Sequence, residues 1–102
     1  MNNAVLRISL REENDAENVV LVLEGRVIGP WVEELRATCA PHLKDRRSLI
    51  LDLAGVSFAD AAGIELLVGL IERRVILANA SPFLRQQLQL NDSISFLGRA
   101  TR

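Results

Sequence analysis

Cys39 and His42 have the side chains with the greatest potential for nucleophilic or metal chemistry in this sequence. Three residues apart, they could share one face of a helix, where an imidazole base can activate a thiol. They could also supply two ligands to zinc, but a structural zinc site needs four, and the sequence contains no other Cys or His. Because a lone buried cysteine ordinarily packs as a small apolar side chain, we expect no metal, cofactor or catalytic role here.

Asp52 and Asp60 flank a central segment of small and apolar residues, and paired carboxylates can perform acid–base chemistry. Each also has a simpler role, because Asp60 stands at an expected helix N-cap and Asp52 at the end of an apolar strand. Gly25 and Gly29 are too sparse for a phosphate-binding loop and lack the accompanying Lys and Ser or Thr. This inventory predicts that the protein is not an enzyme.

The composition argues against nucleic-acid binding and for one small domain. The 102 residues include 12 Lys+Arg against 13 Asp+Glu, without the basic block that phosphate binding requires. Aromatic residues make up only 4 %, with no Tyr, so platforms for stacking bases are hard to build. A hydrophobic content of 49 % readily supplies one core, so we predict a single domain spanning residues 1–102, with 98–102 as a frayed tail.

The N-terminal sequence MNNAVLRISLREEN lacks a basic start followed by an apolar signal segment. The longest apolar stretch, Leu66–Ile71, is far shorter than the roughly 20 residues that a bilayer-spanning helix needs. A single Cys excludes an intrachain disulfide. We therefore expect a cytoplasmic protein without direct membrane insertion.

The stretch Ser48–Ile71, SLILDLAGVSFADAAGIELLVGLI, is the predicted centre of the fold. The apolar run Leu49–Leu51 is typical of a strand buried on both faces, with helices above and below the sheet. We interpret residues 55–59 as a short loop and Asp60 as the N-cap of a helix. The predicted buried face of that helix consists of Ile64, Leu67, Val68 and Ile71.

Gly69 lies inside this helix, where glycine costs on the order of 1 kcal/mol relative to alanine. Either close packing, a partner's approach or simple tolerance at the surface would account for it.

Strands and helices alternate along the rest of the chain. The other predicted strands are 5–10, 19–23, 75–77 and a final edge strand with Ile94 and Phe96. The first two form an antiparallel hairpin, and Gly25 ends the second. One helix opens at Gly29-Pro30 and ends or kinks before Pro41, and another opens at Ser81-Pro82. The order ββαβαβαβ predicts an α/β fold with a mixed, mostly parallel sheet.

The segment LILDLAGVSFADAAGIELL resembles the signature of the STAS family, which is shared by sulfate transporter tails and bacterial anti-sigma factor antagonists. In that family a strand of this kind enters an Asp-Ser/Thr-x-Gly loop and then a helix. Three further features match: the strand end Leu23-Glu24-Gly25-Arg26, the helix start Gly29-Pro30, and Ser81-Pro82 before a late helix. The resemblance covers nearly the whole chain and implies a single STAS-like domain.

The resemblance also implies a regulatory site. In the family, a partner kinase that is also the anti-sigma factor phosphorylates the Ser or Thr after the motif Asp. Asp60 and Gly63 match the motif, but Ala61 occupies the phosphoacceptor position and has no hydroxyl. A phosphate would add about −1.5 to −2 charges at this helix N-terminus, and Ala61 cannot receive it. Ser57 is a nearby hydroxyl outside the family position, and it stays open as a substitute acceptor.

The leading hypothesis is a non-enzymatic regulatory module that binds a protein partner. Its predicted partner-binding loop consists of Ser57, Phe58, Asp60, Ala61, Ala62 and Gly63. The implied partner in bacterial transcription regulation is an anti-sigma factor or a histidine-kinase-like ATPase. The resemblance offers an alternative, an accessory STAS subunit that contacts the ATPase subunit of a lipid-trafficking ABC transporter. A third reading is anion binding at the helix N-terminus, although the loop contains no Lys or Arg.

Overall fold

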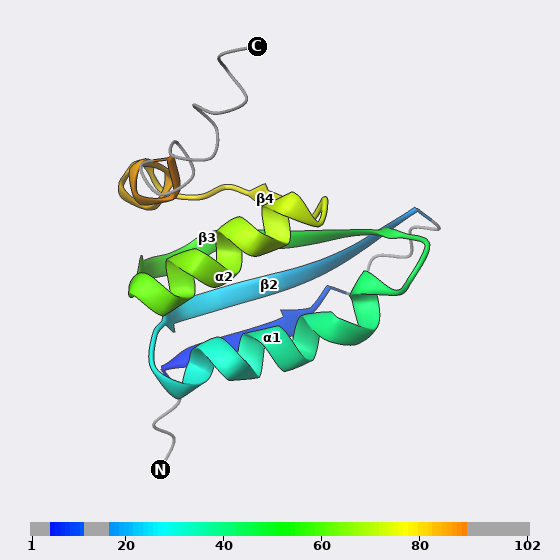
Figure 1. Cartoon of the computed structure of the whole chain (residues 1–102), viewed down its shortest axis with the longest axis horizontal. Helices are drawn as coiled ribbons and strands as arrows, with labels where there is room; N and C mark the ends of the chain where they lie inside the picture. Colours follow the sequence, from blue (N-terminus) through cyan, green and yellow to red (C-terminus); the bar gives the residue numbers. More distant parts are fainter. Residues whose placement is uncertain (1–4, 12–16, 90–102) are drawn as a thin grey trace.

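The computed structural model of the chain describes residues 5–11 and 17–89 (Figure 1). Its elements, in order, are β1 (Leu6–Leu10), β2 (Asn18–Val27), α1 (Pro30–Leu43), β3 (Ser48–Ala59), α2 (Ala61–Glu72) and β4 (Ile76–Ala78). A further helix covers residues 82–89. The predicted α/β order is confirmed through this helix. The predicted strand with Ile94 and Phe96 and the tail 98–102 lie outside the described residues.

The four strands form one sheet in the order β1-β2-β3-β4. β1 is antiparallel to β2, whereas β2 and β3, and β3 and β4, are parallel. The predicted hairpin and the mixed, mostly parallel sheet are therefore confirmed. Leu51 at the centre of the sheet pairs with Leu21 on one side and Leu77 on the other, so all three side chains project from the same face.

Both α1 and α2 cover one face of this sheet (Figure 1). The strand order advances in one direction, and right-handed crossovers that advance in one direction place their helices on the same side. The strands accordingly alternate, with Leu49 and Leu51 buried but Ile50 and Asp52 only half-buried. The prediction of helices on both sides of the central strand is therefore wrong for the described residues.

The core fills the space between the sheet and its helices. α2 buries Gly63, Ile64, Leu66, Leu67 and Leu70. The predicted face of this helix is thus partly wrong, because Ile71 is 39 % exposed and Val68 is half-buried. The physical reason is that α2 packs against α1 as well as the sheet, which widens its apolar stripe and rotates it toward Leu66 and Leu70.

Gly25 lies inside β2 and allows the strand to continue. Its φ is +114°, and a Cβ at this position would lie 1.9 Å from the carbonyl oxygen of Val5. Only glycine permits the Val5 carbonyl to come this close. The same carbonyl oxygen accepts a hydrogen bond from the Arg26 N–H over 2.9 Å. The prediction that β2 ends at Gly25 is therefore wrong.

The extra length of β2 also lengthens β3. Glu24 pairs with Gly55 and Val27 with Ala59, across register shifts that mark β-bulges. Residues 55–59 are consequently strand, and the prediction of a loop there is wrong. The true connection between β3 and α2 is the single residue Asp60.

The helix ends also differ from the sequence prediction. α1 continues through Pro41 to Leu43, because a proline in the last turn removes only one backbone donor. The turn then tightens as the Lys44 N–H donates to the carbonyl oxygen of Pro41 over 3.4 Å. After α2, Arg74 adopts a φ of +74°, the conformation that glycine usually supplies beyond a helix. β4 therefore begins at Ile76, one residue later than predicted.

Candidate functional site

Asp60 connects the starts of both long helices. Its Oδ1 accepts a hydrogen bond from the Gly63 N–H over 2.8 Å, which confirms it as the N-cap of α2. Its Oδ2 accepts from the Gly29 N–H over 2.9 Å, immediately before α1. The Asp60 N–H donates to the carbonyl oxygen of Val27 over 3.2 Å. One side chain thus fixes α1 and α2 at the carboxyl ends of β2 and β3, where α/β folds commonly bind their ligands.

Gly63 allows the first turn of α2 to pack directly against the end of β2. A Cβ at this position would lie 2.3 Å from the carbonyl oxygen of Val27 and 3.2 Å from the Cβ of Ala59. The family motif glycine is therefore required by packing, and its backbone N–H is already used by Asp60.

Four of the predicted loop residues, Ser57, Phe58, Ala61 and Ala62, are exposed around this cap. They do not form a loop, because Ser57 and Phe58 belong to β3 while Ala61 and Ala62 form the first turn of α2. The Ser57 hydroxyl donates to the carbonyl oxygen of Gly25 over 3.4 Å.

Phe83 joins this surface, and the sequence interpretation missed it. Its ring stacks on that of Phe58 with a centroid distance of 6.4 Å and an interplanar angle of 20°. Phe83 and Phe58 remain 50 % and 41 % exposed as residues, so the pair presents apolar area to solvent. Ser81 positions Phe83, since its Oγ accepts from the Leu84 N–H over 3.1 Å and confirms Ser81 as an N-cap. The signal in the sequence for this pair is that the chain has few aromatic residues and that Phe58 and Phe83 are two of them.

Asp52 and Asp60 do not form a catalytic pair. Asp52 lies within β3 and accepts hydrogen bonds from the Arg11 side chain over 2.7 Å and the Asn79 amide over 3.2 Å. The Ala54 N–H, the Asn79 amide and Arg11 together lower the pKa of Asp52. The Gly29 and Gly63 N–H groups lower that of Asp60. Each carboxylate therefore has its own structural partners, in line with the simpler role expected for Asp60, whereas the expectation that Asp52 ends a strand is wrong because β3 continues to Ala59.

These contacts predict the pH dependence of the cap. The folded-state pKa of Asp60 lies below its unfolded value, so ionised Asp60 adds stability that is present above the ordinary aspartate pKa of 3.8. That stability is lost as pH falls through the lower, folded-state pKa. In Asp60→Asn, which keeps a good N-cap residue, we expect a lower Tm than wild type at pH 7 and a smaller difference at pH 3. A Tm difference that grows on acidification would contradict this.

Cys39 lies fully inside the core, where burial raises the pKa of its thiol to about 11. The thiol is therefore protonated at neutral pH and poorly suited to nucleophilic attack. His42 is half-buried in the last turn of α1. Among residues 5–11 and 17–89, no three His, Cys, Asp or Glu side chains gather into a possible metal site.

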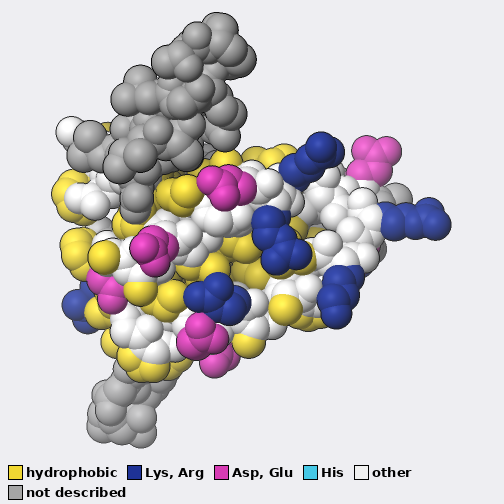
Figure 2. All heavy atoms as spheres, in the orientation of Figure 1, with side chains coloured by type: hydrophobic (Ala, Val, Ile, Leu, Met, Phe, Trp, Pro, Cys, Tyr) yellow, Lys and Arg dark blue, Asp and Glu magenta, His cyan; other side chains and the backbone are white. Residues whose placement is uncertain are grey.

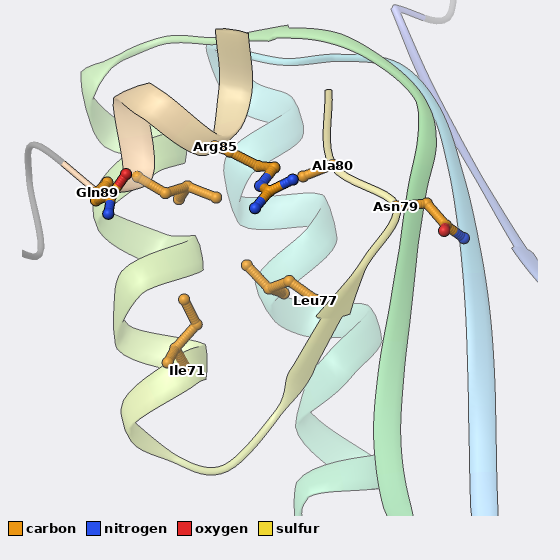
Figure 3. A pocket seen from close by; sticks show the side chains of 7 residues that line it. Ile71, Leu77, Asn79, Ala80, Arg85 and Gln89 are labelled. Carbon is orange, nitrogen blue, oxygen red and sulfur yellow. The ribbon is translucent and has the colours of Figure 1, made fainter. Parts of the chain in front are cut away.

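A hollow of about 580 Å³ lies away from the cap, between α2, β4 and helix 82–89 (Figure 3). Ile71 and Leu77 form its apolar wall, and Arg85 extends across it. Asn79 turns away from the hollow, consistent with its hydrogen bond to Asp52. The other polar side chains that line the hollow are the cation Arg85 and the amide Gln89. Among the described residues, the hollow therefore contains no acid–base pair.

Residues 7–97 match the sequence model of the STAS domain. The chain belongs to the STAS family.

Solved STAS structures agree with this assignment. The unphosphorylated anti-sigma factor antagonist SpoIIAA is 28 % identical, with a TM-score of 0.65 over 81 % of this chain and 82 % of that chain. The phosphorylated Bacillus cell fate determinant SpoIIAA is 25 % identical, with a TM-score of 0.63 over 83 % of each chain. An antisigma-factor antagonist STAS domain from Rhodobacter sphaeroides, 18 % identical, shares the fold with a TM-score of 0.62 over 79 % of this chain and 97 % of that one.

A search of curated proteins gave no match. The likeness of this STAS domain to anti-sigma factor antagonists supports a regulatory interaction module. None of the helices in the described part of the chain combines the length and apolarity needed to cross a bilayer.

Proposed function

We propose that this STAS domain is a non-enzymatic regulatory module that binds a protein partner constitutively, without a phosphorylation switch at the family position. The cap surface, defined as the six predicted residues Ser57, Phe58, Asp60, Ala61, Ala62 and Gly63 together with Phe83, is the proposed interface. The observation that carries the proposal is the position of Ala61. It is exposed at the start of α2, directly after the capping aspartate.

The chemistry of the cap surface suits protein docking. Exposed Phe58 and Phe83 provide an aromatic anchor of the kind that dominates many protein interfaces. Ala61 and Ala62 are small and leave the first turn of α2 open to a partner's backbone. Asp60 accepts one hydrogen bond from Gly63 in that turn and a second from Gly29 before α1, so little ordering is needed on binding.

Phosphorylation at this surface would have a clear physical effect. A phosphate at the first turn of α2 would add about two negative charges beside Asp60 and oppose an apolar interface. Ala61 has no hydroxyl to receive it. Ser57 lies on β3 with its hydroxyl bonded to Gly25, so a phosphate there would not occupy the helix N-terminus.

An anti-sigma factor or a histidine-kinase-like ATPase is the proposed partner class, supported by the likeness to SpoIIAA. Recovery of an ABC transporter ATPase with the purified chain would instead indicate a transporter subunit. Anion binding at α2 is disfavoured physically, because ionised Asp60 already occupies that N-terminus and the cap surface carries no Lys or Arg.

Restoring a hydroxyl tests the proposal. Wild type, Ala61→Ser and the adjacent control Ala62→Ser would be incubated with ATP and the kinase-type partner recovered with the chain. We expect phosphate only on Ala61→Ser, because it alone places a hydroxyl at the family position. Mass spectrometry would locate the phosphate. Equal phosphorylation of wild type and Ala61→Ser would contradict the lost switch, and phosphate on Ser57 would identify that residue as the acceptor.

A further inference from the structure

Gly69 has no explanation in the internal packing of the protein. A Cβ at Gly25 or Gly63 would collide with backbone, but one at Gly69 would meet nothing within 4 Å. Glycine in a helix interior is less stable than alanine, so its presence in the middle of α2 is unfavourable for folding alone. We therefore consider the open space beside Gly69 as a candidate binding surface.

That space is a groove between α1 and α2, with a volume of about 350 Å³. Leu66 and Leu70 from α2 and Leu43 from α1 form its apolar lining, which Gly69 and Ala40 complete. The charged side chains that line it are Arg36, Glu65 and Arg73. Figure 2 shows hydrophobic side chains in the depression between the two helices and charged side chains along its edges. The groove is thus a largely apolar trough that the fold leaves open between α1 and α2.

Positive charge surrounds one end of this groove. It adjoins a depression of about 290 Å³ at the amino end of β3, and Leu43 and Arg73 line both. Arg46 and Arg74 line the depression as well. In residues 5–11 and 17–89, Arg46, Arg73 and Arg74 have no ion-pair partner, whereas Arg47 is paired with Asp45 over 2.8 Å.

The helix dipole accounts for the positions of only some of these arginines. Arg73 and Arg74 follow the last turn of α2, where cations interact favourably with the helix dipole. Arg46, in the connection between α1 and β3, lies beyond the last turn of α1. The dipole also gives no reason for an apolar groove that leads directly to these cations.

We infer that the groove binds an amphipathic helix of a partner protein, with apolar residues in the groove and acidic residues toward Arg46, Arg73 and Arg74. The walls are helices whose backbone groups are already bonded, so they offer no strand edge to extend. The bound segment must therefore form its own backbone hydrogen bonds, as a helix does. This surface is separate from the cap surface, and the inference does not depend on the proposed function.

A displayed library of helical peptides, roughly 18 residues long and therefore five turns, provides the probe. Each peptide has a fixed leucine stripe at helical spacing and randomised flanking positions. Selection against the full chain should enrich Asp and Glu on the flanks. Absence of binders, or enrichment of Lys and Arg, would overturn the inference.

Two matched variants then locate the binding site. Gly69→Leu projects a side chain into the groove from a Cβ that meets nothing within 4 Å, and it should weaken the selected peptides about tenfold or more. Ala37→Leu, on an exposed part of α1 that does not line the groove, should not. Arg73→Gln combined with Arg74→Gln should weaken binding about three- to tenfold at low salt and flatten its salt dependence. Peptides insensitive to Gly69→Leu would show that the groove is not their site and overturn the inference.

Self-association is the remaining test. If the chain alone dimerises in sedimentation experiments and Gly69→Leu abolishes the dimer, the occupant is a second copy of the chain and the inference of a partner's helix is wrong. Ala61→Glu should leave peptide binding unchanged, because Ala61 belongs to the cap surface.

Discussion

Gly63→Ala is expected to destabilise the protein by about 2–3 kcal/mol. The new methyl group would lie 2.3 Å from the carbonyl oxygen of Val27, so either α2 or the end of β2 must move. Such a shift would lengthen the hydrogen bonds by which Asp60 holds Gly63 and Gly29. Urea unfolding followed by circular dichroism measures the change in the free energy of unfolding.

Gly69→Ala is the matched control, six residues further along the same helix. Its methyl group enters open space, so it should stabilise the protein by up to about 1 kcal/mol through helix propensity alone. Opposite signs for two identical substitutions in one helix would separate packing from propensity. A Gly63→Ala variant as stable as wild type would show that α2 does not contact β2 in this way.

The features predicted correctly from the sequence are mostly local. Asp60 and Ser81 cap helices because each is a capping residue type directly before an apolar helical pattern, and Pro30 begins α1 for a similar local reason. The hairpin of β1 and β2 also follows from neighbouring runs joined by a polar segment. Each of these depends on residues close together in the chain.

The features predicted wrongly depend on distant partners. Gly25 has the sequence signature of a strand end, but the close approach of Val5 makes it the middle of a strand. That pairing extends β2, which in turn converts residues 55–59 from the expected loop to strand. Ile50 looks like a residue buried by a second helical layer, yet strand order places both long helices on the other face.

The residues of the candidate site divide in the same way, into those identified from a local motif and those that depend on distant contacts. Resemblance to the STAS family identified Asp60, Ala61 and Gly63, and the structure places them together at the start of α2. Phe83 could not be assigned, because its contact with Phe58 joins residues from two elements far apart in the sequence. Gly69 itself was noticed in the sequence as an unusual helix residue, but the groove beside it could not be predicted, since only the placement of α1 beside α2 creates it.

Ala61→Glu is expected to weaken partner binding by about 100-fold or more while leaving the fold intact. The substitution places a carboxylate at the first helical position of α2, where negative charge is favourable for the helix. In a docked complex the same carboxylate would be desolvated next to Asp60 and the partner's surface. An unpaired buried charge of this kind costs several kcal/mol, and each 1.4 kcal/mol is about tenfold in affinity.

Comparison with Ala37→Glu separates this local effect from a general effect of charge. Ala37 is exposed on α1 and outside the cap surface, so Ala37→Glu changes the net charge equally without touching the interface. Affinity purification of each tagged full-length variant, with the recovered partner quantified per chain, should show loss only for Ala61→Glu. Equal recovery by the two variants, with Tm values matching wild type, would place the partner elsewhere on the domain. The selected groove peptides would then identify whether the α1–α2 surface carries that interaction.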